Sequence, residues 1–187
     1  LKKPLDMIIY DEYGPTEATV GTCINQVYPG RNLTIGKPYN NYKVYVLDLN
    51  LAPLPIGVIG ELYIGGPGLA RGYLNQPELT ASKFIDNPFQ KEQEKRTNEN
   101  RKLYKTGDLV RWLPEGNLEY IGRNDSQVKI RGYRIELGEI ESVLSSYVRI
   151  TQSVVLAKEH KNTDKAVAAQ KYLVGYYVAD DKLNEED

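Results

Sequence analysis

Acids beside glycines are the residues whose types and spacing could do chemistry in this chain. Asp108 follows Thr106 and Gly107 at the end of a stretch that reads as a strand. A carboxylate placed there can accept hydrogen bonds from two adjacent hydroxyl groups of a ligand, each contributing about 1.5 to 3 kcal/mol. The alternative is a turn residue whose carboxylate bonds to its own backbone.

A second acid, Glu17, ends the segment YGPTE that begins at Tyr13. A hard cation that carries phosphate oxygens needs a carboxylate of this kind, and a plain turn is the alternative. Tyr120 offers an aromatic face for a nucleoside, and Arg123 offers a planar fork for ribose or phosphate. The alternatives are a core position for Tyr120 and a surface ion pair for Arg123.

The run from Gln127 to Ile135 contains no acid and three cations, Lys129, Arg131 and Arg134. Its apolar residues change phase by one position after Gly132. Because side chains alternate between the faces of a strand, this slip predicts a bulge or a tight bend. On spacing alone, the run is interpreted as an ordinary bent hairpin with a solvated basic face.

The composition excludes several classes of function. The chain has 187 residues, 41% of them hydrophobic, and its 24 basic and 25 acidic residues give a net charge of -1. This balance argues against nucleic acid or an anionic membrane as a partner. The single cysteine, Cys23, is compatible with a reducing cytoplasm. No apolar run is long enough to span a bilayer.

The sequence offers little support for zinc or covalent catalysis. His160 is the one histidine, so neither a zinc site nor a Ser/His/Asp arrangement can be assembled with confidence. The glycine-rich stretch from Gly65 to Gly72 lacks the lysine of a phosphate-binding loop, and we interpret Gly65 to Gly68 as a turn. What remains are acids suited to a polyhydroxylated or phosphorylated ligand.

Short strands separated by Gly/Pro turns predict a small barrel or sandwich in the first part of the chain. The strands are expected within 6–11, 35–49 and 58–64, with a helix over 78–85 and a polar loop over 90–102. After Asp125 a helix is predicted from Ile140, Val143, Leu144 and Tyr147, which fall on one helical face. Strands over 153–157 and 172–178 follow. The change of pattern predicts a domain boundary at 123–125.

Four stretches together resemble a known family. YGPTE, GELYIGGPGLARGYL, YKTGDL and GRNDSQVKIRGYRIELGEIE occur in the order found in the adenylation domains of nonribosomal peptide synthetases. The resemblance implies an α+β fold. Residues 1–124 would be the end of the large lobe, with a β-rich distorted barrel, and residues 125–187 the beginning of a small α/β C-terminal lobe.

The resemblance also implies roles for the residues that match its motifs. ATP would be bound by Tyr13, Gly14, Glu17, Asp108, Tyr120 and Arg123. Asp108 would hold the two ribose hydroxyls, and Glu17 would hold Mg²⁺. Asp125 would be the hinge about which the small lobe rotates. The residues facing a phosphopantetheine arm would be Lys129, Arg131, Gly132 and Arg134.

By the same resemblance, the parent protein would join an amino acid to AMP and pass it to the thiol of a peptidyl carrier protein, beside a condensation domain. This chemistry belongs to antibiotic biosynthesis. Glu12, Val20 and Gly21 match positions of the amino-acid pocket. An ionised Glu12 can accept a hydrogen bond from a carboxamide, which favours L-asparagine, with glutamine as the fallback.

Two family parts are expected outside this chain: the phosphate loop before Leu1 and the catalytic lysine after Asp187. We therefore expect a C-terminal fragment that is inactive alone. One alternative function is that of an acyl-CoA synthetase of the same superfamily. Tight binding of free coenzyme A would favour it. The other alternative is a non-catalytic interaction module. Absence of nucleotide binding would favour it.

Overall fold

The computed structural model describes residues 7–159 and 171–179, so His160 lies outside the described residues. Contacts between Cα atoms divide the chain into two compact units, Leu1–Asn124 and Asp125–Asp187. Each unit is described by itself. The described fold mixes helices and strands and is rich in strands, in agreement with the predicted α+β class.

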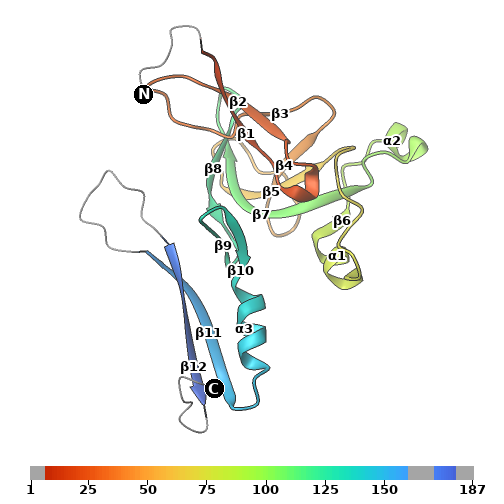
Figure 1. Cartoon of the computed structure of the whole chain (residues 1–187). Coiled ribbons are helices and arrows are strands. Elements are labelled where there is room, and N and C mark those ends of the chain that lie inside the picture. Colours follow the sequence, from red (N-terminus) through yellow and green to blue (C-terminus); the bar gives the residue numbers. More distant parts are fainter. Residues whose placement is uncertain (1–6, 160–170, 180–187) are drawn as a thin grey trace. The chain divides into compact units, whose positions relative to one another are not determined.

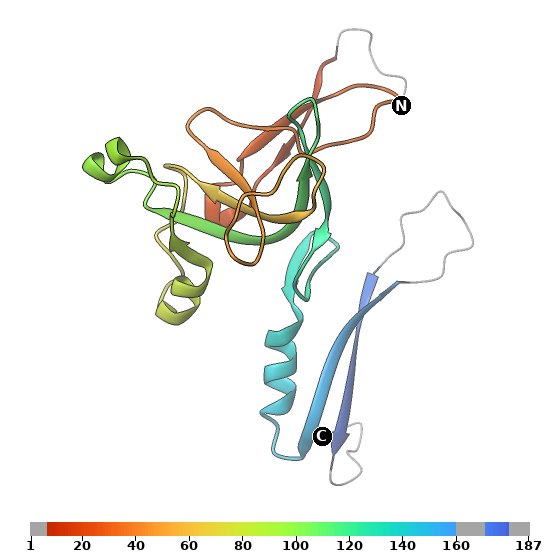
Figure 2. The ribbon, with the colours of Figure 1, turned by 180° about the vertical axis from the view of Figure 1, so that it is seen from behind.

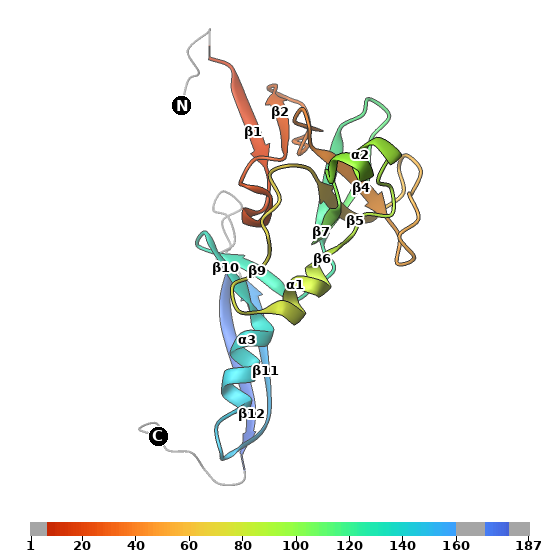
Figure 3. The same cartoon turned by 90° about the vertical axis from the view of Figure 1, so that its right-hand side faces the viewer.

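The first unit begins with a small antiparallel sheet in the order β1-β2-β3. Its strands are β1 Ile9–Tyr13, β2 Cys23–Val27 and β3 Lys37–Pro38. The short 3-10 helix η1, Thr16–Ala18, lies in the connection between β1 and β2. Figure 3 shows β1 beside β2, and Tyr13 pairs with Cys23. The YGPTE motif is thus held where β1 ends.

A five-stranded sheet forms the rest of this unit, with β7 at its centre. Its strands are β4 Lys43–Leu47, β5 Gly60–Gly65, β6 Phe84–Asp86, β7 Lys102–Trp112 and β8 Leu118–Arg123. β5 pairs with one edge of β7, while β6 and β8 share the other edge. Figure 1 shows the long β7 ribbon running past these neighbours. β7 therefore connects residues that lie far apart in the sequence.

The predicted barrel is not closed in the part of the chain that the structure describes. β4 pairs along its length with β5 alone, and β6 pairs with β7 alone. β4 and β6 stand at opposite ends of the strand order and do not pair with each other. The two sheets are instead joined by a bridge between Gly36 and Leu118. The turn density indicated most of these short strands, but it carries no information about closure. The prediction that a strand ends at Asp108 was wrong, because β7 continues to Trp112.

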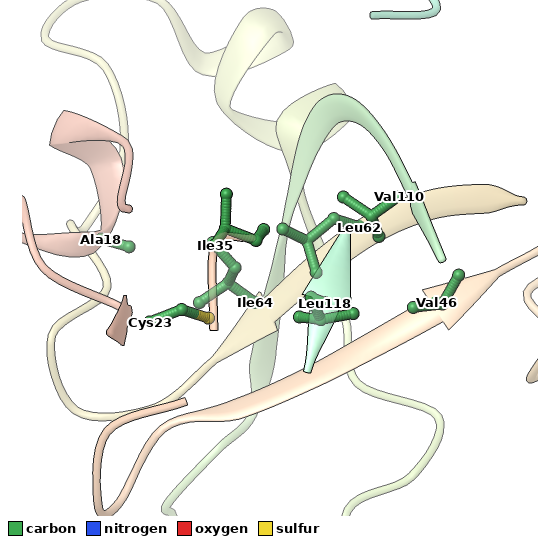
Figure 4. Packing of buried hydrophobic residues seen from close by; sticks show 8 residues of the cluster. All are labelled: Ala18, Cys23, Ile35, Val46, Leu62, Ile64, Val110 and Leu118. Carbon is green, nitrogen blue, oxygen red and sulfur yellow. The ribbon is translucent and has the colours of Figure 1, made fainter. Parts of the chain in front are cut away.

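The core of the first unit lies between these two sheets. Eight side chains, each 8% exposed or less, come from both sheets, from η1 and from the segment before β3. Figure 4 shows them together: Ala18, Cys23, Ile35, Val46, Leu62, Ile64, Val110 and Leu118. A second cluster is formed by Leu47, Tyr63 and Leu103. All six residues of β5 are buried, because β4 and β7 flank it and both clusters cover its faces.

Two short helices lie outside the sheets. Helix α1, Pro77–Lys83, confirms the helix predicted over 78–85. Helix α2, Glu92–Thr97, lies where a loop was predicted, and that prediction was wrong. Its Glu94 carboxylate accepts the backbone N–H of Lys91 at 2.9 Å and pairs with Lys43. The bond from Lys43 is the largest cause that lowers the pKa of Glu94 to about 2.

The second unit begins with the hairpin of β9, Gln127–Ile130, and β10, Tyr133–Glu136. Arg131 and Gly132, with φ of 52° and 85°, form its two-residue loop. Positive φ at both positions matches a type I′ turn, so the predicted phase slip is a tight hairpin turn.

Helix α3, Leu137–Ser145, and the hairpin of β11, Ile150–Glu159, with β12, Lys171–Ala179, complete this unit. Figure 2 shows α3 alongside β11, and the two are in contact. Glu141 accepts the backbone N–H of Val155 at 2.8 Å. Val143 was predicted on the packed face but is 71% exposed, because the half-buried side of α3 runs through Ile140, Glu141 and Leu144. No helix of the described part is long and apolar enough to cross a membrane.

Candidate nucleotide and amino-acid site

Asp108 lies at the centre of a polar cluster in the first unit. Its side chain is buried, with Oδ1 accepting from Arg123 Nη1 at 2.6 Å and Oδ2 accepting from the Tyr13 hydroxyl. Three residues predicted at the nucleotide site therefore meet, although Tyr13 and Asp108 are 95 positions apart. Burial first, and then the charge of Asp108, raise the pKa of Tyr13, so its hydroxyl remains a donor.

The backbone at Asp108 is held by the residues before it. Gly107 has a φ of 78°, a conformation that glycine adopts at little cost. The Thr106 hydroxyl donates to the Leu62 carbonyl at 2.7 Å and accepts the backbone N–H of Asp108 at 2.9 Å. Arg123 also donates to the Thr106 carbonyl at 3.0 Å. The carboxylate is thereby fixed between β1, β7 and β8.

Glu17 occupies a separate position in η1. It is buried, and its Oε1 accepts the Tyr73 hydroxyl at 2.7 Å. Burial is the largest cause that raises the pKa of Tyr73, ahead of the bond to Glu17. Among the described residues no group of three potential metal-ligating side chains is found. A single carboxylate nevertheless suits Mg²⁺, which keeps several waters and binds phosphate oxygens.

The residues matched to the amino-acid pocket lie near the end of β1. Glu12 is exposed and accepts the Tyr39 hydroxyl at 2.9 Å, a bond that raises the pKa of Tyr39. A Cβ atom on Gly21 would approach Glu12 Oε1 to 2.0 Å. Glu12 and Gly21 are therefore neighbours, whereas Val20 is 68% exposed.

The remaining predicted residues of the first unit are Gly14 and Tyr120. A Cβ atom on Gly14 would lie 1.9 Å from the Val20 carbonyl oxygen, so the chain needs glycine there. Tyr120 pairs with Val110 in the sheet but is itself 45% exposed. This exposure removes the alternative in which Tyr120 is a core residue.

The predicted hinge and basic residues all lie in the second unit. Asp125 Oδ1 accepts the backbone N–H of Gln127 at 3.2 Å. Lys129 and Arg134 stand directly opposite each other in the β9–β10 hairpin, and Arg131 lies in its turn. All three are exposed. Like charges directly opposite each other are unfavourable in a sheet.

Several contacts of the cluster involve residues that sequence reasoning missed, namely Glu61, Tyr73 and Asn124. Glu61 accepts from Gly107 and from Asn124, and Tyr73 donates to Glu17. Glu61 and Tyr73 both lie inside GELYIGGPGLARGYL, a stretch that reads as strand and turn. An acid inside an otherwise apolar strand was the one available signal for Glu61.

Comparisons with known proteins point to one family. A family model described as AMP-binding enzyme matches residues 2–74. The N-(5-amino-5-carboxypentanoyl)-L-cysteinyl-D-valine synthase of Amycolatopsis lactamdurans is 52% identical over 96% of this chain, which spans 5% of that protein. Tyrocidine synthase 3 of Brevibacillus parabrevis is 52% identical over 91% of this chain, which spans 2% of it.

A solved structure agrees with these relatives. It is a nonribosomal peptide synthetase protein containing adenylation and PCP domains, with a vinylsulfonamide inhibitor bound. It is 29% identical with a TM-score of 0.74, and the match covers 92% of this chain and 28% of that one. The chain belongs to the AMP-binding, adenylate-forming enzymes, in the branch of the nonribosomal peptide synthetase adenylation domains.

Proposed function

We propose that this chain supplies part of the ATP site and part of the amino-acid pocket of an amino-acid-activating adenylation domain. The parent protein forms aminoacyl-AMP and pyrophosphate from an amino acid and ATP. It then transfers the acyl group to the phosphopantetheine thiol of a peptidyl carrier protein. Residues 1–124 are the end of the large lobe and residues 125–187 the first part of the small one.

The meeting of Tyr13, Asp108 and Arg123 is the observation that carries the proposal. An ionised carboxylate has about four lone-pair directions. The bonds from Tyr13 and Arg123 use one direction on each oxygen of Asp108. We infer that the two ribose hydroxyls of ATP donate to the same carboxylate, beside the Arg123 guanidinium.

Mg²⁺ and the phosphates belong near Glu17 in this proposal. Tyr73 holds Oε1 of the Glu17 carboxylate and thereby orients the group for the cation. When bound, Mg²⁺ neutralises charge on the phosphates. The protein's own contribution is to orient the reactants and to place compensating charge, which are the main means of catalysis in such a transfer.

L-Asparagine is the amino acid that the pocket residues favour, with glutamine second. The Glu12 carboxylate can accept from a carboxamide NH₂ through Oε2 while Tyr39 donates to Oε1. Gly21 lets this carboxylate lie against its backbone, because a Cβ atom there would approach Glu12 Oε1 to 2.0 Å. A substrate without the NH₂ donor would leave a polar group unpaired, and this gives large discrimination.

The second unit would serve the transfer step. Asp125 is the hinge, and Lys129, Arg131 and Arg134 are cations that suit the phosphate of a phosphopantetheine arm. We place the parent protein in the cytoplasm, beside a condensation domain and in antibiotic biosynthesis. This chain spans 2% of tyrocidine synthase 3, so that relative has room for neighbouring domains of this kind.

Amino-acid-dependent exchange of pyrophosphate into ATP by the full-length protein tests the proposal. All twenty amino acids are compared, and Asn should give the highest rate. Preference for a large apolar or basic residue would contradict the asparagine assignment alone. Tight binding of free coenzyme A with no amino-acid dependence would favour the acyl-CoA synthetase. Absence of nucleotide binding would favour the non-catalytic module.

A further inference from the structure

Glu61 is a buried carboxylate to which the proposed function gives no role. It lies in β5 and is 6% exposed. Burying a carboxylate is costly unless hydrogen bonds compensate it. The partners of Glu61 therefore indicate why an acid stands in an otherwise apolar strand.

The two short hydrogen bonds to Glu61 come from two places in the sequence, and the Tyr63 hydroxyl adds a longer one to Oε2 at 3.5 Å. Glu61 Oε1 accepts the backbone N–H of Gly107 at 3.0 Å, and Oε2 accepts the side-chain amide of Asn124 at 2.9 Å. Lys105 Nζ lies 3.7 Å from Oε2. One carboxylate thus joins the residue before Asp108 to the last residue of the first unit.

Glu61 and Asn124, which are bonded to each other, both hold the backbone of Gly107. The N–H of Gly107 is held by Glu61, and its carbonyl accepts the backbone N–H of Asn124 at 2.9 Å. Gly107 has positive φ and is the least restricted residue type, so nothing in its own side chain maintains this conformation. Without Glu61 the backbone before Asp108 can turn, and the Asp108 carboxylate moves with it.

We propose that Glu61 is a positioning residue, which holds the Gly107 backbone and Asn124 so that Asp108 keeps the orientation needed for ribose binding. The inference rests on the proposed function for its kinetic consequence. The contacts themselves do not depend on it.

Three variants of the full-length protein test this role. Glu61→Met removes both acceptors and leaves the Gly107 N–H unpaired. Glu61→Gln can keep both bonds, because its carbonyl accepts from Gly107 while its NH₂ donates to the Asn124 oxygen after that amide turns over. Glu119→Met is the matched control, since Glu119 pairs with Arg111 elsewhere in the same sheet.

Pyrophosphate exchange gives the kinetic readout. We expect Glu61→Met to raise KM for ATP about tenfold, because the buried hydrogen bond from the Gly107 N–H to the charged carboxylate is lost. KM for the amino acid should stay unchanged, and Glu61→Gln and Glu119→Met should stay within about threefold of the parent protein. A merely structural role would reduce the active fraction and hence kcat, with KM for ATP unchanged.

A second readout does not require catalysis. Amide hydrogen exchange of the peptide covering 104–109 should become faster in Glu61→Met and stay slow in Glu61→Gln. If the parent protein shows no exchange of pyrophosphate, the proposed function fails, and amide exchange still decides the role of Glu61. Unchanged protection in Glu61→Met would overturn the inference.

Misfolding of Glu61→Met would be recognised by its circular dichroism spectrum, and Asn124→Ala then replaces it. Asn124 is an exposed residue whose side chain makes one of the two bonds. Its loss should raise KM for ATP about threefold, as expected for one weaker hydrogen bond. An unchanged KM in this variant counts against the role of Glu61.

Discussion

The Tyr13 hydroxyl donates to the Asp108 carboxylate and thereby ties the end of β1 to the middle of β7 across 95 residues. Arg123 reaches the same carboxylate from β8. The contact places Tyr13 and the ribose-binding acid of the proposed site next to each other. In the proposed amino-acid pocket a different tyrosine, Tyr39, donates to the Glu12 carboxylate. The nucleotide site and the amino-acid pocket can therefore be tested separately.

Tyr13→Phe and Tyr39→Phe should therefore have different effects. Each removes one hydroxyl donor from one carboxylate, at a cost of about 0.5 to 1.5 kcal/mol. Tyr13→Phe should raise KM for ATP about three- to tenfold and leave KM for the amino acid unchanged. Tyr39→Phe should do the reverse. Steady-state exchange kinetics with each substrate varied in turn measure both, and equal effects on both substrates would contradict the assignment.

The bond between Tyr73 and Glu17 predicts a change in cation dependence. Tyr73→Phe removes the donor that orients the Glu17 carboxylate, so half-maximal activity should need about three to five times more Mg²⁺. At saturating Mg²⁺ the rate should recover. Tyr42→Phe is the control, because the Tyr42 hydroxyl bonds to the nearby Ala18 carbonyl. A Mg²⁺ titration in which both variants coincide would speak against Glu17 as a ligand.

Several parts of this site were predictable from the sequence, and others were not. The motifs pointed to Tyr13, Asp108 and Arg123, which the structure brings together. The slip at Gly132 correctly indicated a tight turn, because alternation is a local property. The partners of Glu17 and Glu61 lie 56 and 46 positions away, and periodicity carries no information over such distances.

Helix α2 escaped prediction for a different reason. It buries no residue, so it has no apolar periodicity. Its anchors are the bonds of Glu94 to Lys91, Lys43 and Asn100. Polar anchors of this kind leave the same composition as a charged loop, and composition was the basis of the wrong prediction.

Replacing either of two glycines of the second unit by alanine should change the stability of the unit in opposite directions. Neither would place a Cβ atom within 4 Å of another group, but Gly132 has a φ of 85° whereas Gly138 lies in α3. Gly138→Ala should stabilise the unit by about 0.4 to 1 kcal/mol, and Gly132→Ala should destabilise it by about 1 kcal/mol or more. Chemical denaturation measures both, and a stabilising Gly132→Ala would contradict the turn geometry.

The low pKa of Glu94 predicts a pH dependence of the α2 region. Its folded-state value of about 2 lies below the usual 4.5, so the carboxylate contributes stability above pH 4.5. That contribution is lost as the pH falls from 4.5 towards 2. The thermal stability difference between the parent protein and Glu94→Gln should be constant above about pH 5 and shrink in this range. A difference that grows on acidification would contradict the sign.

Discrimination between ATP and 2′-deoxy-ATP by the full-length protein tests the central claim most directly. If Asp108 accepts hydrogen bonds from the ribose hydroxyls, kcat/KM of the parent protein in amino-acid-dependent exchange should be about tenfold higher, or more, for ATP than for 2′-deoxy-ATP. Asp108→Ala should lower kcat/KM for ATP and bring the ratio of the two nucleotides close to one. A variant that loses activity yet keeps the parental ratio would show that Asp108 does not contact the ribose.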